Sequence, residues 1–347
     1  MQVLHGCTCA RLLADKGYTI TLIDKNDFIG GICCDYLSED QSCYIHKFGP
    51  HIFHTTHKSV WNFINQFSTF NNYQHKYYSL YQNKKYVFPI NLNTISELFN
   101  VQVYSKDDVI KLIHDVDIKN PQNFEEAALN SVGTKIYNAF IKNYTLKQWQ
   151  TDPKKLSVDI FKRINIKYDF NDNCFPNQYQ GLPITGYTQL FKNMINHKNI
   201  KLILNQSFES LTNIKQFDCI IYTGGFKNLQ YRSTRFIHFK DKPNQYSVIN
   251  LPEDKLYTRI TNFNILHKNN YVETQHNYCK EMPLSNNEEN ELLPVLTNDN
   301  INYFKIKQNE LKQKYNNILF IGRLATYTYI DMDQAILYAI QLINSFF

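Results

Sequence analysis

The stretch Tyr18-Thr-Ile-Thr-Leu-Ile-Asp-Lys-Asn-Asp-Phe-Ile-Gly-Gly31 decides the class of fold. Its first half is rich in β-formers, and Ile20, Leu22 and Ile23 predict a strand buried in a parallel sheet. Asp24 ends that strand, where an acid can accept both hydroxyls of a ribose. The stretch therefore predicts a doubly wound α/β sheet that holds an adenine dinucleotide at its carboxyl edge.

The segment before this strand predicts a helix over residues 6–14, with Ala10, Leu13 and Ala14 on one face. Gly17 supplies the left-handed residue that ends the helix. A strand, a glycine turn and this helix together make the phosphate cradle of a dinucleotide-binding sheet. Only five residues precede Gly6, so we expect this chain to lack that strand and most of the turn.

Size and composition limit the class of protein. The chain has 347 residues, enough for more than one domain, and a formal net charge of +6 with Lys and Arg scattered among acids. That pattern predicts a phosphorylated small molecule as partner and no nucleic acid. The spacing of the eight cysteines matches neither a zinc site nor a disulfide framework, so we expect reduced thiols in the cytoplasm. No apolar run approaches the roughly 20 residues of a membrane span, and no signal-peptide layout opens the chain.

Three histidines, His46, His51 and His54, surround the dipeptide Gly49-Pro50. The spacing of His51 and His54 suits a metal only on a helix, and Gly-Pro predicts a loop, so we expect no metal there. Two interpretations stay open: the histidines are hydrogen-bonded loop residues, or they place imidazoles beside a cofactor ring.

Further along the chain, apolar periodicity predicts a helix over 58–67, a hairpin over 77–88 and several helices over 95–149, interrupted at Pro121. Two more apolar strands, in 218–225 and 318–322, end in glycines and are expected to face the same cofactor. A helix over 334–346 closes the chain.

Aromatic and cationic residues after the helical region allow two interpretations each. Tyr144 and Trp149 have polar neighbours, so they are either core residues or a platform on which a base stacks. Lys162 and Arg163 are either partners in surface ion pairs or ligands of a diphosphate.

Taken together, the motifs resemble the UDP-galactopyranose mutase family, flavoenzymes that interconvert the pyranose and furanose forms of UDP-galactose. They occur in family order over nearly the whole chain. The matching stretches are Ile45-His-Lys-Phe-Gly-Pro-His-Ile-Phe-His-Thr55, Tyr144-Thr-Leu-Lys-Gln-Trp149, Lys162-Arg163, Tyr179-Gln-Gly-Leu-Pro183, Gly186-Tyr187, Tyr257-Thr-Arg259 and Gly322-Arg-Leu-Ala-Thr-Tyr-Thr-Tyr-Ile-Asp-Met332.

The resemblance implies an α/β protein with three parts. These are a Rossmann-like FAD-binding domain that lacks its first strand (1–63, 187–226 and 314–347), an inserted helical domain (94–160) and an antiparallel-sheet substrate domain (64–93, 161–186 and 227–313). In the family, N5 of reduced FAD attacks the anomeric carbon of the sugar and UDP leaves. The covalently bound sugar opens as an iminium and recloses with the other ring size.

The resemblance also implies partners and a setting. UDP-galactose is the expected substrate, the flavin needs a reductant of unknown identity, and a homodimer is an open expectation. The product belongs to galactofuranose biosynthesis, a branch of cell-wall and polysaccharide biosynthesis.

Site residues carry over by position. The expected catalytic residues are Arg163, Arg259 and His54. The expected substrate-binding residues are Tyr144, Trp149, Arg163, Tyr179, Arg259, Tyr329 and Asp331. The expected cofactor-binding residues are Gly6, Asp24, Gly30, Gly31, His51, His54, Gly224, Gly322, Arg323, Asp331 and Met332.

Three departures from the family pattern matter. Cys174 and Leu293 stand where many bacterial members have tyrosines that hydrogen-bond the diphosphate. Aligned on Gly6, the first two glycines of the Gly-x-Gly-x-x-Gly turn would fall at Met1 and Val3. We therefore expect the chain from Met1 to bind FAD poorly and a version extended by a strand and a Gly-x-Gly turn to hold it. The alternatives are a decayed copy that binds UDP-sugar without turnover and an amine-oxidase-like flavin oxidoreductase.

Overall fold

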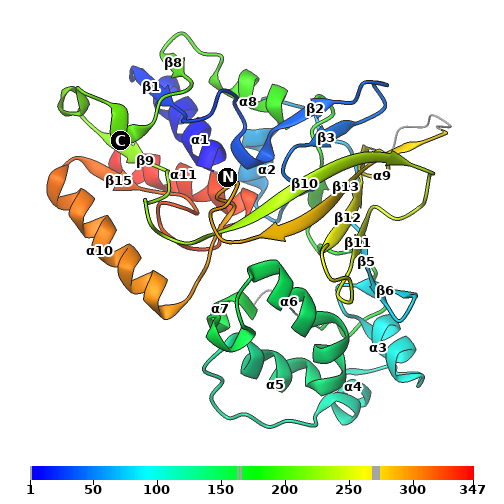
Figure 1. The fold of residues 1–347 in the computed structure, drawn as a ribbon. Coiled ribbons are helices and arrows are strands. Elements are labelled where there is room, and N and C mark those ends of the chain that lie inside the picture. Colours follow the sequence, from blue (N-terminus) through cyan, green and yellow to red (C-terminus); the bar gives the residue numbers. More distant parts are fainter. Residues whose placement is uncertain (1, 162–163, 165, 268–273) are drawn as a thin grey trace. The chain divides into compact units, whose positions relative to one another are not determined.

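A computed structural model describes residues 2–161, 164, 166–267 and 274–347 and divides the chain into two compact units (Figure 1). The first unit is Met1–Tyr73, Asn177–Leu229 and Ile301–Phe347, and the second is Gln74–Pro176 and Gln230–Asn300. The predicted boundaries of three domains are finer than this division and stay a prediction.

The first unit contains the predicted parallel strands, in two separate pairs. β1 (Ile20–Ile23) pairs in parallel with β8 (Ile200–Ile203), and β15 (Ile318–Phe320) pairs in parallel with β9 (Ile220–Tyr222). The expectation that β1 is fully buried is wrong, because its apolar side chains are partly exposed. In the described chain each of these strands has a hydrogen-bonded neighbour along one edge only. No described strand lies along the other edge to shield the side chains from solvent.

The helix α1 (Gln2–Asp15) begins before the predicted Gly6, and Gly17, with φ of 95°, ends it as expected. It begins earlier because Leu4 and Cys7 are also buried in the core of the first unit. α1 packs beside α11 (Met332–Phe346), as Figure 1 shows. Leu13 of α1 and Ile343 of α11 share one apolar cluster, so the two helices form one layer.

Further elements complete the first unit. The helices are α2 (Lys58–Ile64), α8 (Tyr187–Ile195) and α10 (Asn298–Lys314), and α10 starts at the boundary between the units. The short strands are β2 (Asp35–Leu37), β3 (Tyr44–His46), β4 (Phe53–Thr55) and β7 (Tyr179–Gly181). Buried Asp35 accepts hydrogen bonds from the N–H groups of Tyr187 and Thr188 at 2.5 and 2.8 Å, which caps α8. Gly186 is required before this helix, because a Cβ would lie 2.6 Å from the ring of Tyr44.

The second unit is built on a seven-stranded sheet in the order β14-β10-β13-β12-β11-β5-β6. Its strands are β5 (Tyr77–Tyr81), β6 (Lys84–Phe88), β10 (Tyr231–Asp241), β11 (Val248–Asn250), β12 (Arg259–Asn262), β13 (His276–Leu284) and β14 (Leu293–Pro294). The β5–β6 hairpin confirms the prediction over 77–88. The sheet is antiparallel except that β11 pairs in parallel with β5, so the expected purely antiparallel sheet is mixed at one place.

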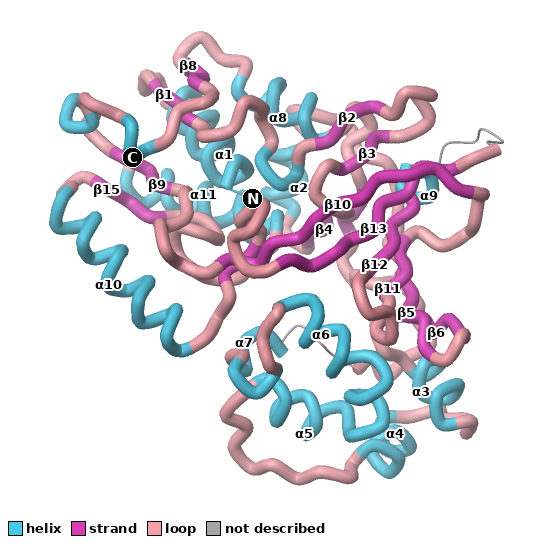
Figure 2. Tube along the Cα trace, viewed as in Figure 1, coloured by secondary structure: helices cyan, strands magenta, loops and turns pink. Residues whose placement is uncertain are grey.

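Helices gather together in the second unit (Figure 2). They are α3 (Leu92–Phe99), α4 (Lys106–Ile113), α5 (Phe124–Ile136), α6 (Lys142–Trp149) and α7 (Val158–Phe161), with the five-residue α9 (Phe263–His267) beside β13. The break predicted at Pro121 lies between α4 and α5. Asn91 and Ser105 begin α3 and α4 with capping boxes, and the buried core includes Ile95, Val109 and Ile136.

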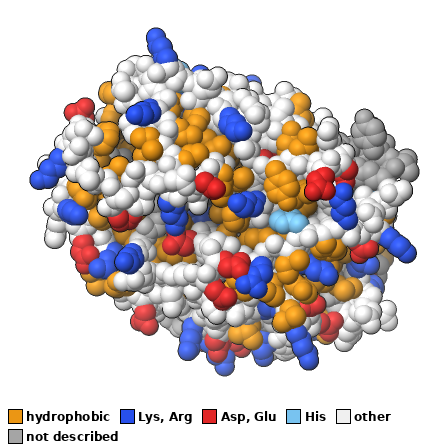
Figure 3. Space-filling model, turned by 45° about the horizontal axis from the view of Figure 1, so that its top comes forward, with side chains coloured by type: hydrophobic (Ala, Val, Ile, Leu, Met, Phe, Trp, Pro, Cys, Tyr) orange, Lys and Arg blue, Asp and Glu red, His pale blue; other side chains and the backbone are white. Residues whose placement is uncertain are grey.

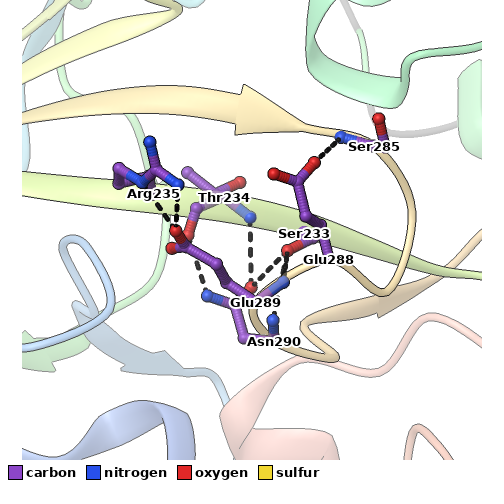
Figure 4. A network of polar contacts seen from close by, with 7 residues as sticks. All are labelled: Ser233, Thr234, Arg235, Ser285, Glu288, Glu289 and Asn290. Carbon is purple, nitrogen blue, oxygen red and sulfur yellow. Dashed lines mark hydrogen bonds and ion pairs between the residues drawn. The ribbon is translucent and has the colours of Figure 1, made fainter.

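A polar turn joins β13 to β14 and ties it to β10 (Figure 4). Ser233 accepts hydrogen bonds from the N–H groups of Glu289 and Asn290, and Asn290 exchanges two bonds with the backbone of Thr234. Arg235 pairs with Glu289 at 2.5 Å. The turn thereby sets Leu293 opposite Arg232 in the ladder between β14 and β10.

The surface mixes charges of both signs. Figure 3 shows Lys and Arg side chains interspersed with Asp and Glu on the face it draws, with no single basic stripe. Among the helices in the described ranges, none has the length and apolar character needed to cross a membrane.

Candidate functional site

The candidate cofactor residues of the first unit begin at Asp24, directly after β1. The Asp24 N–H donates to the Ile203 carbonyl at 3.0 Å, so the residue continues the pairing with β8. Its Oδ1 accepts from the N–H and from the side-chain amide of Asn26, each at 2.9 Å. Burial raises the pKa of Asp24, while these two hydrogen bonds act in the opposite direction. A half-buried carboxylate thus stands at the carboxyl end of a parallel strand, as the sequence predicts.

The following turn needs glycine. Gly30 and Gly31 have φ of 107° and 51°, and a Cβ on Gly30 would lie 3.1 Å from the Cα of Cys34. The turn leads into buried Cys33, whose thiol lies 3.8 Å from the sulfur of Met332. The structure therefore brings two predicted cofactor segments, 30–31 and 332, to one place in the first unit.

Arg323 is the buried cation of this region. Its Nε and Nη2 donate to the Ile330 carbonyl at 3.2 and 2.6 Å, and its guanidinium lies 4.4 Å from the centre of the Tyr329 ring. These contacts close the turn between β15 and α11 around the side chain. They also place two predicted residues, Arg323 and Tyr329, face to face.

Both ends of that turn carry predicted residues. Gly322 has φ of 100°, and a Cβ there would lie 3.2 Å from Nδ1 of His5. Asp331 precedes the first turn of α11, and its N–H donates to the side chain of Gln334 at 3.1 Å. The positive end of the α11 dipole thus lies next to Asp331 and Met332, which suits a negatively charged group.

Of the three histidines only His51 lies in the loop that Gly49-Pro50 predicts, because His46 ends β3 and His54 lies on β4. His51 donates its N–H to Nδ1 of His46 at 3.0 Å, and its own Nδ1 lies 2.9 Å from the Gly49 carbonyl. Burial, and then the nearby His46, hold the pKa of His51 well below its ordinary value, so His51 is a neutral imidazole. His54 lies on β4, with Nδ1 3.1 Å from Oδ1 of Asn177. The rings of His51 and His54 are hydrogen-bonded, as the first interpretation predicts, and the placement of imidazoles beside a cofactor ring stays a prediction.

Three predicted positions differ in how the protein uses them. Tyr179 stacks on Trp61 with 5.5 Å between ring centres, within the first unit. Gly224 leaves room for Tyr222, because a Cβ there would lie 3.0 Å from that ring, so its glycine has a packing reason. A Cβ on Gly6 would make only ordinary contact with Leu22, so the packing of the described chain does not itself require glycine there.

These residues of the first unit fit a flavin dinucleotide. A carboxylate follows a parallel strand, a glycine turn with positive φ comes next, and a buried guanidinium and a helix N-terminus lie in the same unit. Asp24 would hold a ribose, and the region of Arg323 and Asp331 would lie against other polar atoms of the cofactor.

In the second unit, Arg259 begins β12 opposite Glu281 of β13. Its Nε lies 3.1 Å from Oε1 of Glu281, whose side chain is only 3% exposed, while the Arg259 side chain is 25% exposed. The ion pair orients the guanidinium and leaves part of it accessible. Such a fixed cation can bind a phosphate group.

Trp149 ends α6 and is 8% exposed. The guanidinium of Arg232, from β10, lies 5.8 Å from the centre of its ring. The amide of Gln148 satisfies both of its neighbours when its oxygen faces Arg232, at 2.6 and 3.2 Å, and its nitrogen donates to Thr258 Oγ1 at 3.1 Å. Gln148 therefore connects Arg232 on β10 with Thr258, the residue before Arg259, and Trp149 lies next to this connection.

Arg232, Gln148 and Thr258 join this arrangement although they are not among the site residues predicted from the sequence. Gln148 and Thr258 lie inside the matching stretches 144–149 and 257–259, but Arg232 lies in none of them, and the three residues share no spacing that would connect them. Tyr144 lies on α6 one turn before Gln148 and is half-buried. Leu293 is buried opposite Arg232, and the N–H of Cys174 donates to the His75 carbonyl at 2.7 Å. Arg163 and Lys162 lie outside the described residues.

Comparisons with known proteins agree with one another. The family model described as UDP-galactopyranose mutase matches residues 139–329, and the model described as NAD(P)-binding Rossmann-like domain matches residues 4–67.

Relatives match along almost the whole chain. A dTDP-fucopyranose mutase of Escherichia coli is 35% identical over 97% of this chain and 94% of its own length. A Klebsiella pneumoniae protein named a probable UDP-galactopyranose mutase is 32% identical over 98% and 92%. The crystal structure of a reduced UDP-galactopyranose mutase matches with a TM-score of 0.76 at 15% identity, over 98% of this chain and 90% of that one, which shows a shared fold.

Proposed function

The chain belongs to the UDP-galactopyranose mutase family of flavin-dependent isomerases, and from this premise we propose that it interconverts UDP-galactopyranose and UDP-galactofuranose. The observation that carries the proposal is the arrangement in the second unit. There an aromatic ring, Trp149, and an oriented cation, Arg259, stand on elements joined through Gln148 and Thr258. An aromatic ring and a cation are the partners that a nucleoside diphosphate needs.

The base and the diphosphate of the substrate each have partners in this proposal. Trp149 and Tyr144 stack or flank the base. Arg259, together with Arg163, holds the diphosphate and stabilises its negative charge as the bond to the sugar breaks. Removing one such donor from an active site typically raises the barrier by about 3 kcal/mol.

FAD is the proposed cofactor, held by Asp24, the turn at Gly30-Gly31 and the region of Arg323. Reduced FAD, when bound, supplies the electron pair that attacks the anomeric carbon of the sugar. The residues of the first unit orient the cofactor. His51, being neutral, can act there as a hydrogen-bonding group without adding charge.

The experiment combines purified protein, FAD reduced by dithionite, and UDP-galactofuranose or UDP-galactopyranose, with the products separated by chromatography. We expect each form to yield the other when the flavin is reduced and much less when it is oxidised. Absence of product at high enzyme, with absorbance showing that FAD is bound and reduced, would overturn the proposal. Nucleotide binding without product would instead support the inactive copy.

A second candidate substrate is dTDP-fucopyranose, because the relative that is 35% identical carries the name of a mutase for that sugar. The two substrates differ in the base, the ribose and the sugar C6, and the same cation would serve both diphosphates. Comparing kcat/KM for UDP-galactofuranose and dTDP-fucofuranose in one preparation decides between them. The larger value identifies the substrate.

A further inference from the structure

Lys147 links the helix of the aromatic platform to the loop that leads into Arg259. This lysine lies on α6 between Tyr144 and Trp149 and is half-buried. Its ammonium donates to the Leu251 carbonyl at 2.7 Å and to the Asp254 carbonyl. Both carbonyls belong to residues 251–258, the connection between β11 and β12.

That connection has an ordered structure of its own. The N–H of Leu251 donates to the Thr258 carbonyl at 2.8 Å, which closes the loop at its base. Asp254 Oδ1 accepts the N–H groups of Leu256 and Tyr257, each at 2.7 Å, which forms the turn at its tip. Because the loop is held at its base and at its tip, contacts at Leu251 and Asp254 also restrict the positions of Thr258 and Arg259.

Gln148 makes a second contact with the same loop, at Thr258. Two consecutive residues of α6 thus hold the connection at its base and near its tip. They stand between the two residues, Tyr144 and Trp149, that the proposed function assigns to the base.

We propose that Lys147 is a positioning residue, which sets the distance between the base platform on α6 and the diphosphate cation Arg259. The inference rests on the proposed function, because it takes Trp149 and Arg259 as ligands of one sugar nucleotide. Lys147 itself touches neither substrate nor cofactor in this proposal.

The charge of Lys147 matters because its acceptors are neutral carbonyls. Hydrogen bonds from a cation are about twice as strong as those from a neutral group. Burial lowers the pKa of Lys147 to about 8, while the charge of Asp254 acts in the opposite direction. The loop also carries Glu253, which accepts the N–H of Gln82, and exposed Lys255, and α6 carries Lys142. From the sheet, Arg232 lies beside Gln148, and the ammonium of Lys280 lies 5.3 Å from the centre of the Tyr257 ring.

The test measures UDP affinity by calorimetry, which needs no turnover, for the wild type, Lys147→Met and the control Lys142→Met, an exposed lysine on the same helix. We expect Lys147→Met to weaken UDP binding about 5-fold and Lys142→Met to leave it unchanged. In turnover, KM should rise while kcat stays within about two-fold. Equal affinity of wild type and Lys147→Met would overturn the inference alone. Failure of the wild type to bind either UDP or dTDP would overturn the proposed function, and this inference with it.

A double-mutant cycle and a pH series separate positioning from a general loss of structure. Lys147→Met should weaken UDP binding by less than about two-fold when Trp149 is already alanine, because the lysine acts through that ring. UDP affinity of the wild type should decline as the pH rises through about 8, and that of Lys147→Met should not. Additive losses in the cycle would contradict the inference. The pH series on the wild type tests the inference even if Lys147→Met fails to fold. A UDP affinity of the wild type that does not change with pH would also contradict the inference.

Discussion

The two units hold their candidate site residues in different ways. In the first unit, Asp24 and Arg323 stand after short parallel strands, and each is fixed by a near neighbour in the chain, Asn26 or Ile330. In the second unit each residue is fixed by a partner from another element, as Arg259 is by Glu281. We therefore expect substitutions in the first unit to act on binding of the cofactor, and those in the second unit to act on binding or turnover of the sugar nucleotide.

The largest effect is expected for Arg259→Ala. It removes a cation whose contribution grows as the diphosphate leaves, so kcat should fall by about 10²–10³-fold and UDP affinity by much less. Steady-state kinetics with reduced flavin, together with calorimetry, measure both quantities.

The control is Arg235→Ala, which removes a guanidinium from β10, a strand of the same sheet that β13 separates from β12. Arg235 forms an exposed pair with Glu289, and such pairs contribute about 0–1 kcal/mol (Figure 4). If Arg235→Ala slowed turnover as much as Arg259→Ala, the effect would come from the net charge and not from the site.

Trp149→Ala should chiefly weaken binding. Loss of stacking on a base reduces affinity by about 1–3 kcal/mol, or roughly 5- to 150-fold, and kcat should change little. The titration of UDP is compared with that of Trp61→Phe, the other tryptophan, which lies in the first unit against Tyr179. Equal losses in kcat and in affinity for both Arg259→Ala and Trp149→Ala would show that the division of roles is wrong.

In the first unit, Asp24→Asn should lower FAD affinity about 10-fold, because an amide accepts hydrogen bonds from a ribose less strongly than a carboxylate does. Quenching of flavin fluorescence measures the dissociation constant. Asp27→Asn, an exposed neighbour, provides the control. The UDP affinity of Asp24→Asn should equal that of the wild type. If Asp24→Asn also lost UDP affinity, the expected difference between the two units would be wrong.

The smallest effect concerns stability. Burial raises the pKa of Asp24 in the folded protein, so its charged form lowers the free energy of unfolding as the pH rises above the ordinary carboxyl range. Flavin-free Asp24→Asn should therefore melt about 1–3 °C above the wild type at pH 7, and the difference should vanish at pH 3, where both side chains are neutral. A lower Tm at pH 7 would mean that the two hydrogen bonds from Asn26 outweigh burial.

The sequence by itself determined the elements whose signals are local. β1 ends directly before Asp24, Gly17 ends α1, and the hairpin over 77–88 forms, because strand alternation, helix periodicity and turn residues act over a few neighbours. The long motifs likewise identified the family, since they place unusual residues such as Tyr144 and Trp149 at fixed short spacing.

Only the tertiary structure decided which distant residues meet. The pairing of Arg259 with Glu281 follows from the register of β12 and β13, and the meeting of Gln148 with Arg232 and Thr258 follows from the docking of α6 on the sheet. The same holds for Asp35, which caps α8 from a strand about 150 residues earlier in the chain. No spacing in the sequence encodes these contacts, because packing and strand order bring together side chains that the chain itself separates.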